Sequence, residues 1–187
     1  MNDVARRTTD DRHLETLGRL TRGALHEIAN PLLALVGSAE LALAEVEPGS
    51  KLHARLDTVR ATGLEIAQIV RALQAFVRKR NEPSRPLSLT EAAEEAAALV
   101  GLVNSAPDID VAARTEANPS VYEPPGAVAR ALVELLLDGL ATAQGGDVVE
   151  LVVREEGLDG VVALAGVGDG VVALAGVGEL RLPKVDA

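Results

Sequence analysis

Apolar residues recur at helical spacing along the first part of the chain. From Arg12 to Val46 they fall three or four positions apart, which predicts an amphipathic helix. The segment Glu47–Ser50 (EPGS) then supplies a stop, a turn and a new N-cap. A second series follows in steps that alternate between four and three residues, a heptad seam held for almost four heptads. Its members are Leu52, Leu56, Val59, Gly63, Ile66, Val70, Leu73 and Val77.

Two long helices joined by a tight loop make a helical hairpin. One hairpin cannot bury both faces of an aliphatic seam of this length, whereas dimerisation into a four-helix bundle would cover it. We therefore expect residues 12–80 to form an antiparallel hairpin that dimerises. Residues 1–11 are polar and unpatterned, which predicts a disordered tail.

The pattern changes after the second helix. Residues 81–86 contain two prolines and read as a linker. From residue 87 to 187 the order is helix, strand, helix and then several strands, which indicates a small α/β domain and an α+β chain overall. The expected helices cover residues 88–103, where Ser88 and Glu91 match a capping box, and 126–143. The expected strands cover residues 108–114 and 148–154, with a three-proline loop over 119–125.

A perfect internal repeat follows these elements. DGVVALAGVG occurs at residues 159–168 and again at 169–178. Two short apolar runs separated by Val167-Gly168-Asp169-Gly170 predict a β-hairpin. A recent duplication of a single strand is the alternative.

Composition limits the kinds of site that the chain can carry. Hydrophobic residues make up 48%, but with one Phe, one Tyr and no Trp the core must be aliphatic. The absence of cysteine excludes disulfides, thiolate metal sites and a cysteine nucleophile. No apolar run reaches 18 residues and no signal-peptide pattern is present, so a cytoplasmic location without membrane insertion is expected.

Charge divides the chain in the same place as the pattern. Residues 1–80 carry 12 of the 18 basic and 10 of the 28 acidic residues, a net charge of +2, which leaves −12 for residues 81–187. A basic front and an acidic back suggest two modules. The acidic module argues against nucleic acid as a partner, because phosphate binding needs clustered Lys and Arg.

One histidine of the first helix has a setting that suits phosphoryl transfer. His26 lies at the edge of the apolar stripe, with Arg19 and Arg22 on its face at i−7 and i−4. Their positive charges could bind phosphate oxygens. The adjacent Glu27 could orient a ring nitrogen or act as a base. Pro31 has no N–H, which frees the carbonyl of Glu27 and predicts a bend there.

The residues around this histidine carry a family resemblance. His26-Glu27-Ile28-Ala29-Asn30-Pro31-Leu32 resembles the H-box (H-E-x-x-N-P-L) of sensor histidine kinases. In that family the motif lies on the dimerisation and histidine-phosphotransfer hairpin, the same fold that the apolar spacing predicts. The resemblance implies that His26 is the phosphoacceptor, Glu27 the acid/base residue, and Asn30 and Pro31 the positions that shape the helix. His13 and His53 have no such setting and are expected to be ordinary helical residues.

The resemblance weakens in the second module. In the family this domain binds ATP through an Asn-bearing helix that holds Mg²⁺ and an Asp-x-Gly-x-Gly turn whose Asp recognises adenine. The segment 132–139 is similar to that helix, but its two Asn positions carry Glu134 and Asp138. Segment 164–168 is similar to the turn, with Leu164 in place of the Asp before Gly166 and Gly168. Since leucine accepts no hydrogen bond from adenine, the resemblance implies a degenerate, truncated ATPase-like domain with no tightly bound cofactor.

These observations favour a histidine phosphotransfer protein of a two-component phosphorelay. His26 would accept a phosphoryl group from, and donate it to, receiver-domain aspartates, with Mg²⁺ held by the receiver. The expected partners are a second copy of the chain, response-regulator receiver domains and a histidine kinase. Two alternatives stay open: a weak or partial sensor histidine kinase that phosphorylates His26 with ATP, and a non-catalytic dimerisation module that regulates a true histidine kinase.

Overall fold

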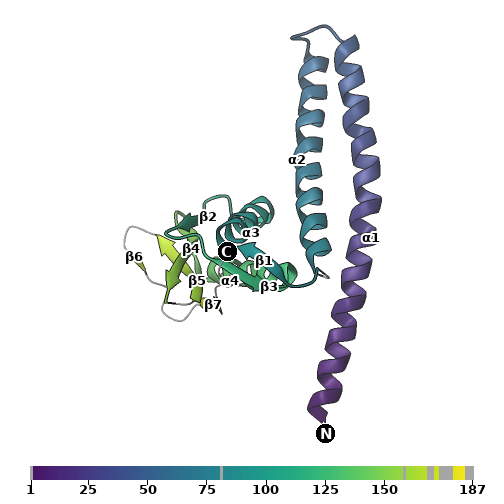
Figure 1. Ribbon diagram of the computed structural model, residues 1–187. Coiled ribbons are helices and arrows are strands. Elements are labelled where there is room, and N and C mark those ends of the chain that lie inside the picture. The colour runs from purple at the N-terminus through teal and green to yellow at the C-terminus, as the bar shows by residue number, and fades with distance from the viewer. Residues whose placement is uncertain (1, 81, 158, 168–170, 173–178, 184–187) are drawn as a thin grey trace. The chain divides into compact units, whose positions relative to one another are not determined.

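The computed structural model describes residues 2–80, 82–157, 159–167, 171–172 and 179–183, with the side chains of the first helix described from Leu20 onward. Helices and a mixed sheet make an α+β fold, as the sequence predicts (Figure 1). The chain divides into two compact units, Met1–Val77 and Arg78–Ala187. Each unit is described by itself below.

The first unit is the predicted helical hairpin. Helix α1 spans Asn2–Glu45 and helix α2 spans Lys51–Lys79 (Figure 1). Between them Gly49 has φ +82°, a left-handed conformation that glycine adopts without the cost of a Cβ. Ser50 then caps α2, since its Oγ accepts a hydrogen bond from the N–H of His53 at 3.1 Å.

Helix α1 begins earlier than the sequence pattern indicates. Residues 2–11, predicted as a disordered tail, lie within α1. No Gly or Pro occurs between residues 2 and 17, so nothing in the backbone chemistry stops the helix from continuing into this polar stretch. Polar composition alone was therefore a poor guide to the helix start.

Small residues make the contact between the two helices. The buried apolar side chains of α1 are Leu25, Val36 and Ala39, and the buried residues of α2 are Gly63, Ala67 and Val70. A Cβ built on Gly63 would lie 2.6 Å from Cγ2 of Val36, so the helices approach closely because this position has no side chain.

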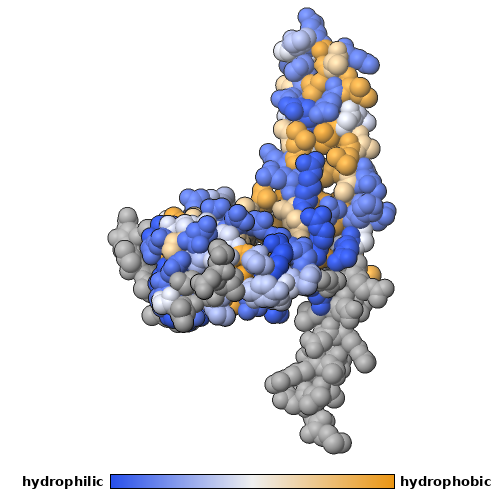
Figure 2. All heavy atoms as spheres, viewed as in Figure 1, coloured by the Kyte–Doolittle hydropathy of each residue, from blue (hydrophilic) through white to orange (hydrophobic). Residues whose placement is uncertain are grey.

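The larger aliphatic residues of the hairpin remain exposed. Within one chain Val59 and Ile66 of the predicted seam are each 42% exposed and Leu52 is 55% exposed. On α1, Leu41 is 72% exposed and Ile28 is 48% exposed. Figure 2 shows apolar residues gathered along much of the hairpin surface. The hairpin thus carries more apolar surface than its own helix–helix contact covers.

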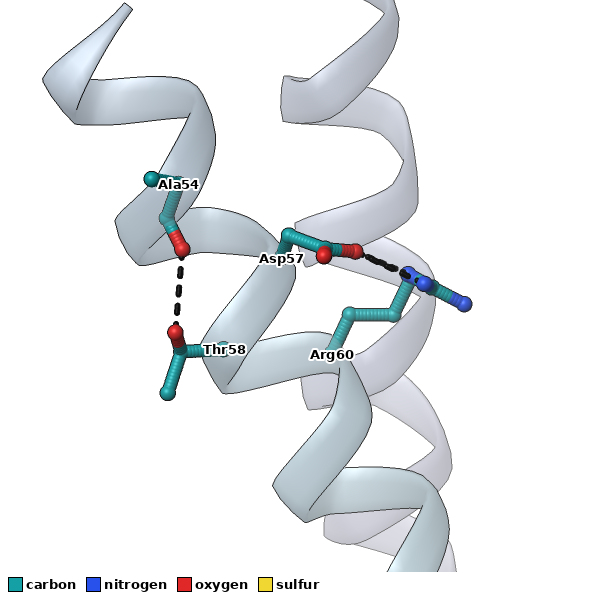
Figure 3. A network of polar contacts seen from close by, with 4 residues as sticks. All are labelled: Ala54, Asp57, Thr58 and Arg60. Carbon is teal, nitrogen blue, oxygen red and sulfur yellow. Dashed lines mark hydrogen bonds and ion pairs between the residues drawn. The ribbon is translucent and has the colours of Figure 1, made fainter. Parts of the chain in front are cut away.

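Helix α2 also carries a pair of charged residues beside its apolar positions. Arg60 donates hydrogen bonds to Oδ1 of Asp57 from Nε at 3.2 Å and from Nη2 at 2.7 Å (Figure 3). This contact raises the pKa of Arg60 above its ordinary value. One position away, Oγ1 of Thr58 donates to the carbonyl of Ala54 at 3.0 Å, which satisfies the hydroxyl within its own helix.

The second unit is a small α/β domain in which two helices pack against a sheet. Its larger sheet has the order β2-β4-β5-β6, with β7 also paired to β5; β2 and β4 are parallel and the other pairs are antiparallel. A separate two-stranded sheet pairs β1 with β3. The elements are β1 Arg85–Ser88, α3 Leu89–Val103, β2 Asp110–Thr115, β3 Ser120–Glu123, α4 Pro125–Thr142, β4 Val148–Glu156, β5 Asp159–Val167, β6 Val171–Val172 and β7 Glu179–Pro183.

The core of this domain is aliphatic, as the composition predicts. Helices α3 and α4 place their apolar faces against β4 and β5. Ser88 caps α3 in the expected way, since its Oγ accepts a hydrogen bond from the N–H of Glu91 at 3.1 Å. The fully buried side chains include Leu89, Val100, Leu132, Leu136, Leu151 and Val153.

Two segments differ from the sequence expectations. The last two residues of the predicted linker, Arg85 and Pro86, lie in β1, and the three-proline loop over 119–125 contains β3. Both strands belong to a two-stranded sheet, so each has a free edge, where the missing N–H of a proline breaks no ladder. Proline content therefore concealed this small sheet.

Residues 159–167 of the first repeat copy form the whole of β5. Gly166 and Val167 pair antiparallel with Val172 and Val171 of β6, the arrangement expected of a hairpin. The remainder of the second copy, residues 169–170 and 173–178, lies outside the described residues, as does Gly168.

Within the described residues, segment Leu20–Glu45 of α1 is long and apolar enough to cross a membrane. This finding rests on the length and the composition of the segment alone. A helix that packs in a bundle meets the same criteria.

Candidate functional site

His26 lies on the surface of α1, next to one of the buried contacts of the hairpin. Leu25 is 7% exposed and packs toward α2, whereas His26 and Glu27 are both exposed. A step of 100° per residue explains this difference, because the helix turns His26 away from the contact that Leu25 makes. The imidazole is therefore accessible to another protein.

The proline of the H-box lies inside α1, which continues through it. Pro31 and Asn30 are exposed. Because Pro31 has no N–H, the carbonyl of Glu27 has no donor at the usual i+4 position. The turn that follows His26 thus lacks one backbone hydrogen bond.

Of the two arginines on the face of His26, the structure describes the side chain of Arg22. Arg22 is exposed, and its Nη2 lies 3.5 Å from the carbonyl oxygen of Val77 in the last turns of α2. This long contact leaves the guanidinium largely in solvent, one turn before His26. The side chain of Arg19 lies outside the described residues.

A third polar residue near His26 was missed from the sequence. Gln74 of α2 is half-buried, and its Nε2 donates a hydrogen bond of 3.2 Å to the carbonyl oxygen of Leu25. Gln74 is a single polar residue beside the seam positions Leu73 and Val77, and no motif distinguishes it. Only the pairing of the two helices reveals the contact.

The positions similar to an ATP site are divided between surface and core. Glu134 and Asp138 are exposed on α4, and Gly166 is half-buried on β5. Leu164 is 8% exposed and belongs to the hydrophobic core of the domain. A Cβ built on Gly139 of α4 would lie 2.8 Å from Cδ2 of Leu164, so the leucine packs directly against the helix backbone.

This packing determines which chemical groups surround position 164. The side chain of Leu164 fills the space between β5 and α4 with apolar atoms, and its partner across the strand pair is the buried Leu151. Nothing at this position can accept a hydrogen bond from adenine. The two acids on α4, Glu134 and Asp138, are exposed and add negative charge to the surface of the domain.

Among the described residues, no group of three or more His, Asp or Glu side chains is placed to hold a metal ion.

No protein-family model matches the chain. Three solved histidine kinases are similar to it. Full-length ShkA in complex with AMPPNP has 18% identity and a TM-score of 0.47 over 84% of this chain and 35% of that chain. ThkA in complex with the response regulator protein TrrA has 14% identity and a TM-score of 0.41 over 88% and 50%. A histidine kinase from Burkholderia phymatum has 16% identity and a TM-score of 0.41 over 76% and 66%.

All three are histidine kinases, the family that the H-box resembles. The chain spans about a third of the length of the first and half of the length of the second. At TM-scores below 0.5 these similarities support no argument about function, which rests on the H-box motif, the exposed His26 and the buried Leu164.

Proposed function

We propose that the chain is a histidine phosphotransfer protein of a two-component phosphorelay, with His26 as the phosphoacceptor. The observation that carries this proposal is the combination of an exposed His26 in an H-box with a core leucine at the adenine-recognising position. The histidine is accessible, while the chain offers no fit to ATP. The phosphoryl group therefore comes from another protein.

The transfer step uses groups that the hairpin presents. The unprotonated ring nitrogen of a neutral His26 attacks the phosphorus of a receiver aspartyl phosphate. The N–P bond forms, the P–O bond to the aspartate breaks, and the aspartate leaves as a carboxylate. The other ring nitrogen, which carried the proton throughout, can release it to Glu27 or to solvent. The reverse sequence passes the phosphoryl group to a second receiver.

Charge around His26 favours this reaction. Arg22 lies one helical turn away on the same face, where its guanidinium can leave the long contact with Val77 and bind phosphate oxygens. The receiver supplies its own Mg²⁺. Among the similar proteins, ThkA was crystallised with a response regulator, which supports a receiver domain as the partner here.

A homodimer is part of this proposal. Exposed aliphatic residues cover both helices of the hairpin, Leu41 and Leu52 among them, and a second hairpin of the same kind would bury them. The partner is a copy of the chain because the surface is apolar on both helices, so that two identical hairpins complement each other.

The test is transfer from a phosphorylated receiver. Receiver domains from the same genome, labelled with ³²P-acetyl phosphate, are incubated with the chain and with the variants His26→Gln and His53→Gln. We expect an acid-labile label on the wild type and on His53→Gln, and none on His26→Gln. A wild type that stays unlabelled with every receiver would refute the phosphotransfer role.

A parallel measurement separates this role from that of a weak kinase. The wild type is incubated with [γ-³²P]ATP and Mg²⁺, and its melting temperature is measured with and without millimolar ATP. We expect no label and no shift in the melting temperature. Label on His26 from ATP alone would establish the kinase alternative instead.

A further inference from the structure

One side chain of α2 contacts the turn of α1 that precedes His26. Nε2 of Gln74 donates a hydrogen bond to the carbonyl oxygen of Leu25 at 3.2 Å, in a half-buried position. The contact of Arg22 with Val77 lies one turn further along the same pair of helices. Together they are the two side-chain to backbone hydrogen bonds that the described residues make between α1 and α2.

The bond to Leu25 adds to the ordinary helix ladder. A carbonyl oxygen has two lone pairs, so that of Leu25 can accept from the N–H of Ala29 and from Gln74 at once. Leu25 is also buried, at 7% exposure, so its turn is held to α2 both by packing and by a directional bond. This fixes the rotation of α1 at the residue before the histidine.

The turn on the other side of His26 is less constrained. Pro31 removes the donor that the carbonyl of Glu27 would otherwise have. His26 therefore lies between a turn tied to α2 and a turn that lacks one backbone hydrogen bond. Bending of α1 at Pro31 changes the direction of the segment after Pro31 relative to the turn that Gln74 contacts.

Resting on the phosphotransfer role of His26, we propose that Gln74 is a positioning residue for that histidine. Its amide holds the Leu25 turn against α2, so that the imidazole keeps its orientation toward a docked receiver while the helix bends beyond it. Apolar seam neighbours such as Leu73 supply packing but no directional bond. Gln74 touches neither the phosphoryl group nor the receiver.

The experiment compares Gln74→Met with Gln68→Met. Methionine keeps the length of glutamine but has no donor, and Gln68 is an exposed glutamine on the same helix. Two quantities are measured: hydrogen–deuterium exchange of the α1 amides, and the rate of His26 labelling as the concentration of phosphorylated receiver is varied. We expect Gln74→Met to lower the maximal rate about fivefold, with the half-saturating concentration unchanged.

The exchange data identify the cause. Loss of a positioning bond raises exchange at residues 26–30 and leaves the rest of the hairpin as in Gln68→Met. Faster exchange along both helices would instead mean general destabilisation, and would overturn the positioning role. So would a Gln74→Met variant that matches the wild type in rate and exchange. An unlabelled wild type would refute the phosphotransfer role itself, and the positioning role with it.

Discussion

Replacement of Leu164 by aspartate tests whether the position that resembles an adenine-binding aspartate belongs to the core. Leu164 is 8% exposed and packs against the backbone of α4 at Gly139. Removal of a buried leucine side chain costs about 2 to 5 kcal/mol in lost transfer energy and cavity formation. The Leu164→Asp variant incurs that cost and places a carboxyl group among apolar atoms.

The carboxyl group adds a cost that depends on pH. Burial without a partner disfavours the charged form, so the introduced group has a pKa in the folded state above the value of about 3.9 in the unfolded chain. Below pH 3.9 the group is protonated in both states and adds no charge penalty. As the pH rises, the penalty grows by about 1.4 kcal/mol per unit until the folded-state pKa is reached. At pH 7 it is at most about 4 kcal/mol, so the total loss is comparable with the whole stability of a small domain, about 5 to 15 kcal/mol.

The assay is urea unfolding of the full chain at pH 4 and pH 7. The control is Leu137→Asp, which makes the same change at a leucine of α4 that is 49% exposed. We expect Leu164→Asp to be much less stable than the control at pH 7 and to recover part of the difference at pH 4. Equal stability of the two variants, or a difference independent of pH, would refute the assignment of Leu164 to the core.

Two further substitutions test the hairpin. Gly63→Ala places a Cβ that would meet Cγ2 of Val36 at 2.6 Å, so we expect it to lower the melting temperature, whereas Gly37→Ala, with no atom within 4 Å, should raise it through a helix propensity gain of about 1 kcal/mol. A rise in both variants would show that the helices do not touch at Gly63. Val59→Asp puts a charge on the exposed apolar surface, where Val59 is 42% exposed; we expect sedimentation to show a monomer, while Ala61→Asp on the opposite face of α2 stays dimeric. Dimers of Val59→Asp would remove this face from the proposed interface.

The sequence pattern predicted the elements that have a strong apolar periodicity or a recognisable capping residue. The two long helices follow from apolar spacing, and the cap at Ser88 follows from Glu91 three residues later. Both signals act within a few residues of the chain, so they require no knowledge of the tertiary structure. The fold class follows from the order of these elements.

The remaining elements depend on contacts between distant residues. β1 and β3 are short, lie among prolines and are stabilised by each other, with Pro86 paired to Tyr122 across 36 positions of sequence. The heptad seam shows which residues are apolar and not which partner covers them. Gly63 and Val70 are buried within the hairpin, whereas Val59 and Ile66 are each 42% exposed in one chain. Gln74 was missed for the same reason, since its acceptor on Leu25 lies 49 residues away.

The candidate site was more predictable than the sheet, and the reason is physical. Exposure of His26 needs only a helix and a buried neighbour at Leu25, and both follow from local spacing. The burial of Leu164 needs the whole domain to fold, because its partners come from α4 and β4. The sequence shows a leucine where the resemblance would place an aspartate, but not that this leucine is part of the core.

The burial of Leu164 makes the proposed loss of ATP binding difficult to reverse by a single substitution. An exposed leucine could revert to aspartate at little cost, and the chain could regain the recognising group by one change. Leu164 instead supports Gly139 and the strand pair with Leu151, so the reverting change removes core packing before any nucleotide binds. Recovery would require a repacked core as well as the aspartate. His26 carries no such constraint, because its side chain is exposed and the hairpin contact is made by its neighbours. A change at position 164 therefore leaves the surroundings of His26 unaltered, as the proposed transfer from a partner protein requires.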